Sequence, residues 1–112
     1  MPECIFCKIA KKEIPAKIVY EDNDILAFDD IEPKVRIHVL IIPQKHIPSA
    51  VDLKSEDGEL IGEMFMGAVK IAREKGILES GFRVVVNHGK DAGQTINHLH
   101  FHLLGGEKLP FA

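Results

Sequence analysis

The sequence predicts an α+β fold, in which a five-stranded antiparallel sheet carries one long helix and one short N-terminal helix. Short segments rich in β-branched residues, which are typical of strands, lie before and after a single long amphipathic stretch, which is typical of a helix. The turn residues Asp22 and Asn23 join the first two strands, as is usual for antiparallel neighbours. No internal repeat, low-complexity segment or linker divides the 112 residues, so we expect a single domain over residues 1–112.

Prolines and turn residues set the element boundaries in the first half of the chain. Pro15 ends the N-terminal helix because its ring cannot continue a helix, and Pro43 closes the third strand because it lacks a ladder donor. Asp22 and Asn23 are turn residues between the first two strands. The expected elements are a helix at residues 5–12 and strands at residues 17–21, 24–29 and 36–42.

The long helix is expected over residues 55–75, with Ser55 as candidate N-cap and Gly76 as the C-terminal stop. Residues 82–87 and 98–104 are the fourth and fifth strands. Because the helix packs on one face of the sheet, the opposite face is predicted to stay available for a ligand. The apolar residues that recur at helical steps are Leu60, Ile61, Met64, Phe65, Ala68, Ile71 and Ala72.

The fifth predicted strand alternates histidine with apolar residues, which is the period of an extended chain. Its apolar residues would enter the core, while His98, His100 and His102 would line the opposite face about 6.5–7 Å apart. Imidazoles at that spacing suit one small anion or one metal ion. The alternative is an exposed strand face whose histidines have no role.

A polar loop over residues 87–97 leads directly into the histidines. Its glycines let the backbone approach a phosphate and point N–H groups toward it, while Gln94 and Thr95 offer side-chain donors. An ordinary hairpin connection has a similar composition. The loop alone therefore does not decide between the two.

Composition favours small-molecule chemistry over nucleic-acid binding. The 14 basic and 17 acidic residues give a net charge of −3, and one tyrosine and no tryptophan are present for base stacking. No apolar stretch approaches the roughly 20 residues of a membrane span, and the N-terminus lacks the regions of a signal peptide. We expect a cytoplasmic protein without a nucleic-acid or membrane partner.

Cys4 and Cys7 are the two cysteines of the chain and form a Cys-x-x-Cys pair. A thioredoxin-like redox pair is disfavoured, because that motif follows a strand and this pair precedes every predicted strand. A structural zinc site needs four ligands, of which two would be neutral imidazoles that cysteine spacing does not identify. Zinc binding and two plain thiols both stay open on these grounds.

The histidine segment and its approach loop resemble the signature of the histidine triad (HIT) superfamily of nucleotide hydrolases and transferases. That signature reads His-φ-His-φ-His-φ-φ, where φ is apolar, and every position from 98 to 104 fits. Similar segments occur upstream at residues 4–9, 13–18, 28–31 and 38–47. The resemblance covers almost the whole chain, points to the Hint branch, the histidine triad nucleotide-binding proteins, and implies a HIT-like fold.

The resemblance implies a hydrolase that cleaves purine nucleoside 5′-phosphoramidates or related nucleotidyl bonds at the α-phosphorus. His100 would be the nucleophile, and water would hydrolyse the nucleotidyl-histidine to release a nucleoside monophosphate, with no catalytic metal. For His38, a buried structural histidine is the alternative to a catalytic one. The resemblance assigns catalysis to His100, His102, Thr95 and His38, and nucleotide binding to Ile14, Phe28, Asp30, Ile31, Leu40, Asn87, Gly93, Gln94, Thr95, His100 and His102.

The resemblance also implies a metal and a partner. Bacterial Hint-like proteins that keep the cysteine pair bind a structural zinc ion, whose ligands here would be Cys4, Cys7, His46 and His98. Hint-like proteins are homodimers, in which the region of the fourth strand and the long helix pack against their twofold copies.

Three departures from the family pattern bear on leaving-group selectivity. Thr95 replaces a common serine, His88 occupies a position that is often acidic, and the tail after Gly105 lacks the tryptophan of many relatives. Two other functional classes stay open. One is a metal-dependent enzyme with its ion on the three strand histidines, and the other is a nucleotide-binding regulatory or partner-binding protein with little turnover.

Overall fold

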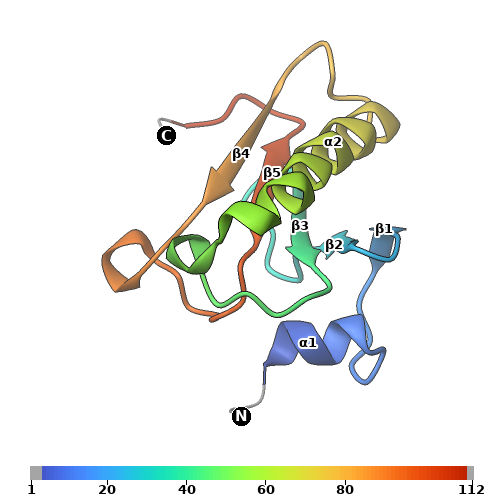
Figure 1. The fold of residues 1–112 in the computed structure, drawn as a ribbon. Coiled ribbons are helices and arrows are strands. Elements are labelled where there is room, and N and C mark those ends of the chain that lie inside the picture. Colours follow the sequence, from blue (N-terminus) through green and yellow to red (C-terminus); the bar gives the residue numbers. More distant parts are fainter. Residues whose placement is uncertain (1–3, 111–112) are drawn as a thin grey trace.

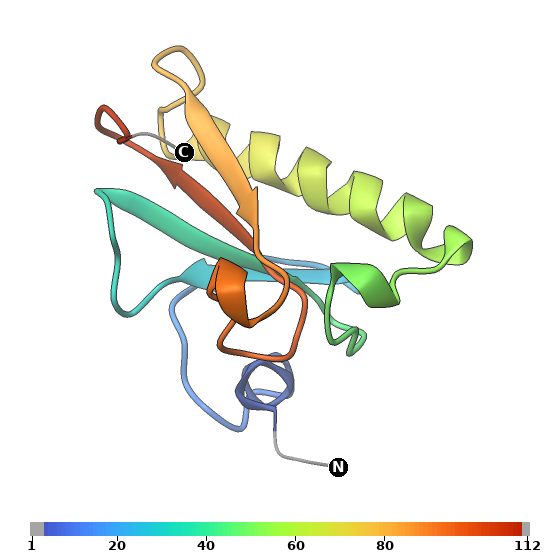
Figure 2. The ribbon, with the colours of Figure 1, turned by 90° about the vertical axis from the view of Figure 1, so that its left-hand side faces the viewer.

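The structure is a computed structural model that describes residues 4–110, and it confirms the predicted α+β fold class. Five antiparallel strands form one sheet in the order β1-β2-β3-β5-β4. Helices α1 and α2 lie on opposite sides of this sheet (Figures 1 and 2). The elements are α1 (Ile5–Ala10), β1 (Ile18–Glu21), β2 (Ile25–Asp29), β3 (Ile37–Pro43), α2 (Gly58–Glu74), β4 (Phe82–Val86) and β5 (Phe101–Gly105), with short 3₁₀ helices at Ala50–Asp52, Ser55–Asp57 and Lys90–Ala92.

The register of the central strands decides which residues share a face. Leu40 of β3 lies opposite His102 of β5, and His38 lies opposite Leu104. Directly opposed residues in antiparallel strands point to the same side of the sheet. His38 and His102 therefore share the face that looks away from α2.

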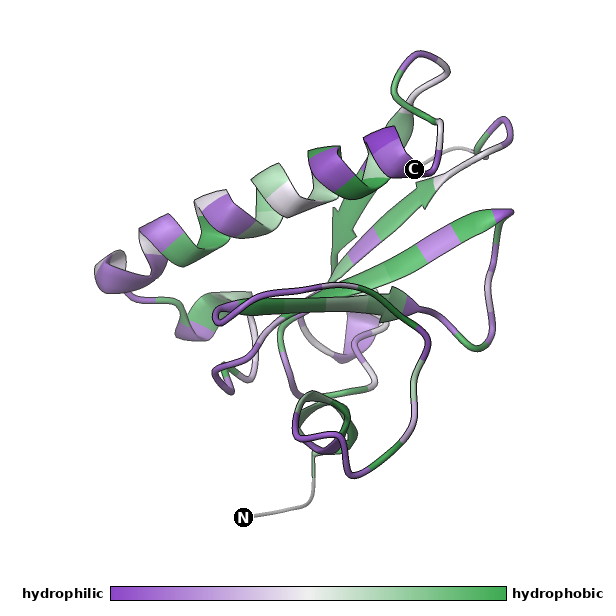
Figure 3. Cartoon of the chain, turned by 90° about the vertical axis from the view of Figure 1, so that its right-hand side faces the viewer, coloured by the Kyte–Doolittle hydropathy of each residue, from purple (hydrophilic) through white to green (hydrophobic). Residues whose placement is uncertain are grey.

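The main hydrophobic core lies between the sheet and α2. Apolar residues of α2 recur at helical spacing, and Figure 3 shows hydrophilic and hydrophobic segments alternating along the helix. Gly67 lets α2 approach the sheet closely, because a Cβ at this position would lie 2.8 Å from Cδ1 of Ile25. The buried residues of this core are Ile25, Ala27, Val39, Ile41, Met64, Ala68, Ile71, Phe101 and Leu103.

A second, smaller core lies between the other face of the sheet and α1. Phe6 and Ile9 of α1 are buried there, and the Phe6 ring meets the Phe28 ring edge-on at 5.5 Å between centroids. Helix α1 therefore covers part of the face that was predicted to stay available for a ligand. The sheet residues of this core are Leu26, Phe28, Leu40 and Ile42.

The fifth strand begins three residues later than predicted. Leu99 N–H donates to the carbonyl of Ile47 at 2.6 Å, and His98 N–H donates to Ile96 at 2.9 Å, so residues 98–100 stay outside the sheet ladder. The strict alternation of the histidines therefore does not mean that all three lie in one strand. Only His102 of the three belongs to β5.

Two helix boundaries also differ from the prediction. The first helix ends at Ala10 rather than at residue 12, because Lys12 adopts a left-handed conformation with φ of 65°. Ser55 begins a 3₁₀ helix, and α2 starts only at Gly58. The buried carboxylate of Asp57 accepts from the Lys54 N–H at 2.9 Å at this junction. Among the described residues, no helix is long and apolar enough to cross a membrane.

Candidate active site

A cysteine–histidine cluster joins three distant parts of the chain beside α1. The Nδ1 atom of His98 lies 3.3 Å from Sγ of Cys4 and 3.6 Å from Sγ of Cys7. The Nδ1 atom of His46 lies 3.2 Å from Sγ of Cys7 and 3.2 Å from Nδ1 of His98. The ligand atoms of all four residues are within 4.8 Å of one another. Two sulfurs and two imidazole nitrogens are a donor set that zinc prefers in structural sites.

The second ring nitrogen of His98 makes the cluster suitable for a metal. Nε2 lies 2.9 Å from the carbonyl oxygen of Pro43. A carbonyl only accepts, so Nε2 carries the hydrogen and the lone pair is on Nδ1, which faces the cysteines. Burial lowers the pKa of His98, which favours this neutral form. Such a hydrogen bond to the second nitrogen is the usual support of a metal-bound histidine.

The thiol of Cys7 needs a metal to ionise near neutral pH. Burial, together with the neighbouring Cys4, raises the pKa of Cys7 to about 11. A bound divalent metal deprotonates a coordinating thiol outright. The residues of this cluster therefore fit a zinc ion by number, by atom type and by tautomer.

His100 lies next to this cluster but presents its other nitrogen. Nδ1 of His100 lies 2.7 Å from the carbonyl oxygen of His98 and donates to it. The lone pair is consequently on Nε2, the atom that a nucleophilic role requires. His100 is 8% exposed, and the Phe6 ring meets the imidazole edge-on at 5.2 Å between ring centroids.

His38 and His102 form a hydrogen-bonded chain that ends in a donor. The N–H of Lys34 donates to Nδ1 of His38 at 3.0 Å, so Nε2 of His38 carries a hydrogen. This Nε2 lies 3.0 Å from Nδ1 of His102 and 3.4 Å from a carboxylate oxygen of Asp30. If the hydrogen is donated to His102, the remaining nitrogen of His102, Nε2, carries its own hydrogen. His102 is then an N–H donor beside His100.

The imidazoles of His38 and His102 both stay neutral near neutral pH. Burial and the neighbouring His100 and His38 lower the pKa of His102 to about 4. Burial also lowers the pKa of His38, although the nearby Asp30 opposes this effect. The histidine cluster, defined here as His38, His100, His102 and Asp30, therefore provides neutral hydrogen-bond donors and one free lone pair.

The three histidines of the triad do not converge on one metal ion. His98 directs its lone pair at the cysteines, while His100 is oriented by the His98 carbonyl. Asp30, His38 and His102 are also close enough to hold a metal. However, the lone pair of His38 is on Nδ1, where the Lys34 N–H already occupies it. This geometry disfavours the metal-dependent alternative.

The residues expected to surround the nucleoside are only partly brought together. Phe28 and Leu40 are buried in the smaller core, and Ile14 packs against it half-buried. Asp30 lies near His38 and its second carboxylate oxygen accepts from the Glu32 N–H at 2.9 Å. Ile31 does not pack with these residues, because it is 91% exposed.

Gln94 supports the loop rather than offering free donors. Its Oε1 accepts from the Gly89 N–H at 3.1 Å, and its Nε2 donates to the carbonyls of Pro48 at 2.9 Å and Ile96 at 3.1 Å. Both amide hydrogens are therefore engaged. The expectation that this side chain donates to a phosphate is not supported by its hydrogen bonds.

The other expected loop residues lie near Gln94. Asn87 donates to the Ala92 carbonyl at 2.9 Å and closes the loop. Gly93 has a φ of 84°, a left-handed conformation that favours glycine. Thr95 is exposed, which leaves it accessible to a ligand.

Sequence reasoning missed three contributors to the site. Phe6 lies between the two cysteines and meets both His98 and His100 edge-on. The N–H of Lys34 and the carbonyl of Pro43 set imidazole tautomers, but backbone groups leave no trace in residue type. The position of Phe6 inside the Cys-x-x-Cys pair was the one available signal.

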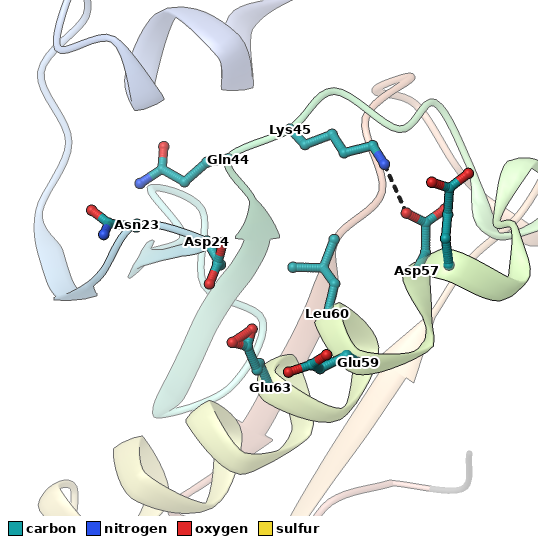
Figure 4. A pocket seen from close by; sticks show the side chains of 9 residues that line it. Asn23, Asp24, Gln44, Lys45, Asp57, Glu59, Leu60 and Glu63 are labelled. Atoms are coloured by element: carbon teal, nitrogen blue, oxygen red, sulfur yellow. Dashed lines mark hydrogen bonds and ion pairs between the residues drawn. The ribbon is translucent and has the colours of Figure 1, made fainter.

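A cavity of about 400 Å³ lies away from the two clusters, between the start of α2, the start of β2 and the end of β3 (Figure 4). Lys45 donates there to a carboxylate oxygen of Asp57 at 2.8 Å. Its lining contains neither histidine nor cysteine, so this cavity lacks the nucleophile and metal ligands of the two clusters. The lining residues are Asn23, Asp24, Gln44, Lys45, Glu56, Asp57, Glu59, Leu60 and Glu63.

Known proteins resemble this chain over nearly its whole length. The family model described as "Scavenger mRNA decapping enzyme C-term binding" matches residues 3–109. A purine nucleoside phosphoramidase of Escherichia coli (strain K12) is 45% identical over 107 residues, which cover 96% of this chain and 90% of the relative. The protein HitA of Neisseria gonorrhoeae is 44% identical over 105 residues, or 94% of this chain and 97% of the relative.

Solved structures of HIT family proteins have the same fold as this chain. A HIT family hydrolase from Legionella pneumophila Philadelphia 1 superposes with a TM-score of 0.96 at 46% identity and covers 97% of each chain. A histidine triad protein from Clostridium difficile also has a TM-score of 0.96, at 45% identity, over 100% of this chain and 97% of that one. Similarity at this level extends to both the sheet and the two helices.

Proposed function

Since this chain belongs to the histidine triad (HIT) family, we propose that it is a purine nucleoside phosphoramidase, a nucleotide hydrolase of the HIT type. It would cleave nucleoside 5′-phosphoramidates or related nucleotidyl bonds at the α-phosphorus and release the nucleoside monophosphate. One observation carries the proposal. The Nδ1–H of His100 is bound to a carbonyl at 2.7 Å, so the Nε2 lone pair is available for attack.

In the proposed reaction, Nε2 of His100 forms a bond to the α-phosphorus while the bond from phosphorus to the leaving nitrogen breaks. The leaving nitrogen keeps the electron pair of that bond, takes a proton from solvent and departs as a neutral amine. A neutral imidazole is a good nucleophile at neutral pH, and covalent catalysis divides the displacement into two easier steps. The Nδ1–H stays on the carbonyl of His98, so the nucleotidyl-histidine carries a positive charge. That charge makes the imidazole a better leaving group when water attacks the phosphorus.

His102 would stabilise the negative charge on the nonbridging phosphate oxygens. Its Nε2–H is the free donor at the end of the chain from Lys34 through His38. Donors that are aligned before reaction lower the free energy of such a transition state. The loop backbone and the hydroxyl of Thr95 would add donors, and His38 would act by orienting His102.

The nucleoside would lie toward Asp30. Its carboxylate would accept hydrogen bonds from the ribose hydroxyls, and Ile14, Phe28 and Leu40 would form the apolar wall near the base. The support for this role is the position of the Asp30 carboxylate, 3.4 Å from Nε2 of His38. Ile31 would contribute only at the exposed rim.

We also propose that Cys4, Cys7, His46 and His98 hold a structural zinc ion. The support is the donor set and the tautomer of His98 described above. When bound, the ion supplies a cross-link between the N-terminus, the segment after β3 and the segment before β5. No step of the hydrolysis passes through it.

A homodimer is proposed because the molecule has two features that proteins usually cover, an edge strand and exposed apolar residues on the long helix. β4 is an edge strand of the sheet, and α2 exposes Phe65, Met66 and Val69 by 49%, 67% and 39%. Such an edge and such a patch are usually covered in solution. Sedimentation at micromolar concentration should report about twice the chain mass of 12.5 kDa; a clean monomer would contradict the proposal.

The decisive experiment is incubation with an adenosine 5′-phosphoramidate substrate, followed by chromatography and mass spectrometry. We expect release of adenosine monophosphate and, after rapid quenching, an adenylylated peptide spanning residues 91–108. His100→Ala should give neither product. Tight nucleotide binding without turnover by the wild-type protein would instead favour the regulatory alternative.

A further inference from the structure

We propose that the cysteine–histidine cluster positions the His100 nucleophile, through the main chain of His98 and the ring of Phe6. This inference rests on the proposed function, because it assigns a consequence for catalysis to a site that would otherwise only stabilise the fold. His98 and Phe6 are positioning residues in this view. Neither residue contacts the substrate in the proposed reaction.

His98 is part of both clusters at once. Its side chain faces the sulfurs of Cys4 and Cys7, while its own carbonyl oxygen accepts the Nδ1–H of His100 at 2.7 Å. The side chain is 0% exposed. Whatever restrains the His98 ring therefore also restrains the carbonyl that selects the tautomer of His100.

The sheet does not hold that carbonyl in place. Residues 98–100 precede β5, and the ladder to β3 begins only with the pair of Ile41 and Phe101. The segment is held instead by Leu99 N–H on the Ile47 carbonyl, one residue after the ligand His46. The position of the segment thus depends on the same short stretch that would bind the metal.

Phe6 provides a second connection from the cluster to the nucleophile. It lies between Cys4 and Cys7, and its ring centroid is 5.9 Å from that of His98 and 5.2 Å from that of His100. Helix α1 has only six residues, which is too short to be stable without tertiary support. Ligation of the two cysteines would hold α1, and with it Phe6, against His100.

Opening the cluster should weaken both connections together. A neutral histidine in water prefers its hydrogen on Nε2, the tautomer that has no lone pair at the attacking atom. The carbonyl of His98 opposes this preference. When the cluster is opened, we expect part of the His100 population to change tautomer, so that kcat falls while KM changes little.

The test is two-bond ¹H–¹⁵N correlation NMR on protein labelled at histidine nitrogens, which reads the tautomer of each imidazole without substrate. Spectra of the zinc-loaded wild type are compared with those of the chelated, reduced protein and of His46→Gln. His46 is chosen because its described hydrogen-bond and ring contacts are to Cys7 and His98, and not to Phe6 or His100. We expect an Nδ1–H signature for His100 in the loaded protein and a mixture of tautomers in the other two samples.

Hydrolysis kinetics on the same samples complete the test. We expect kcat to fall roughly 10-fold to 100-fold, the cost of a small misplacement of a reacting group, and KM to stay within about twofold. Gly67→Ala is the matched control, because its Cβ would press on Ile25 in the distant main core. It should lower stability and leave the tautomer of His100 unchanged.

An unchanged His100 tautomer in folded, metal-free protein would overturn the positioning role. The same conclusion would follow if Gly67→Ala shifted the tautomer as much as chelation does, because the effect would then reflect general stability. A tautomer shift in a protein that hydrolyses no phosphoramidate would support positioning and contradict the proposed function. If chelation unfolds the chain, the His100 tautomers of His46→Gln and Gly67→Ala are compared instead, and a shift in His46→Gln alone supports the positioning role.

Discussion

The cysteine–histidine cluster and the histidine cluster contain the same type of side chain but direct it to different tasks. In His98 a carbonyl binds the Nε2–H, which leaves the lone pair on Nδ1 for a metal. In His100 a carbonyl binds the Nδ1–H, which leaves the lone pair on Nε2. The two imidazoles are separated by a single residue. In both imidazoles, the hydrogen bond of one ring nitrogen decides the chemistry of the other.

His102 extends the comparison to a third role. Its Nδ1 lies 3.0 Å from Nε2 of His38, which carries a hydrogen, so His102 offers a donor instead of a lone pair. The triad can thus provide a metal ligand, a nucleophile and a hydrogen-bond donor at alternating positions. Substitutions that affect one role should leave measurable parts of the others intact.

The largest effect is expected from His100→Ala. Because this imidazole alone would form the covalent bond, hydrolysis should fall by a factor on the order of 10⁴ or more. Nucleotide binding, measured by calorimetry, should survive, and zinc content should be unchanged. Near wild-type hydrolysis by this variant would refute the covalent mechanism.

A smaller loss of activity is expected from His102→Ala. This change removes one phosphate donor, which typically costs about 10²–10³ in kcat. Steady-state kinetics should detect slow turnover through the same adenylylated His100. If turnover disappears as completely as in His100→Ala, the two residues do not have the distinct roles assigned to them.

Changing the cysteine–histidine cluster should lower stability, in addition to the roughly 10-fold to 100-fold fall in kcat expected from the displaced His100. Cys7→Ser should lower zinc content from about one ion per chain, as measured by atomic emission. It should also lower the free energy of unfolding by roughly 4 kcal/mol if zinc is present at about 1,000 times its Kd. Thermal melts with and without zinc provide the measurement. Wild-type protein that is metal-free and equally stable would favour plain thiols.

The smallest expected effect is a pH dependence of stability that comes from the histidine cluster. The pKa of His102 is lowered to about 4 and that of His38 is lowered as well, so the unfolded chain binds more protons than the folded one. The contribution of these two histidines to stability should therefore fall as pH decreases from the ordinary histidine range toward about 4, and their contribution should level off below that. Denaturant unfolding of His102→Gln should show a shallower slope in this window; an identical slope would contradict the lowered pKa.

Local sequence patterns were sufficient for much of the fold. The turn at Asp22 and Asn23, the β-branched run that ends at Pro43 and the helical spacing of α2 each depend on residues close together in the chain. The resemblance of the histidine segment and of the cysteine pair to the HIT signature indicated the family. Both are patterns of residue type, which the sequence displays directly.

The orientation of each imidazole ring depends on tertiary contacts. Period-two alternation predicted that His98, His100 and His102 share a strand face, yet the carbonyls of Pro43 and Ile47 hold residues 98–100 outside the strand. Gln94 was predicted as a phosphate donor, yet it binds backbone carbonyls. These partners are main-chain groups, which every residue has, so residue type does not reveal them.

Residue patterns along the chain were thus enough to indicate which segments form strands and helices and which reactive side chains are present. Tertiary packing set the start of β5 and the nitrogen that each imidazole presents. Cys4 and His98 are 94 positions apart, and His38 and His102 are 64 apart. A hydrogen bond requires its two atoms to lie within about 3 Å in a favourable direction. Contacts of that precision between distant residues arise when the sheet and α1 pack, and no local pattern specifies them.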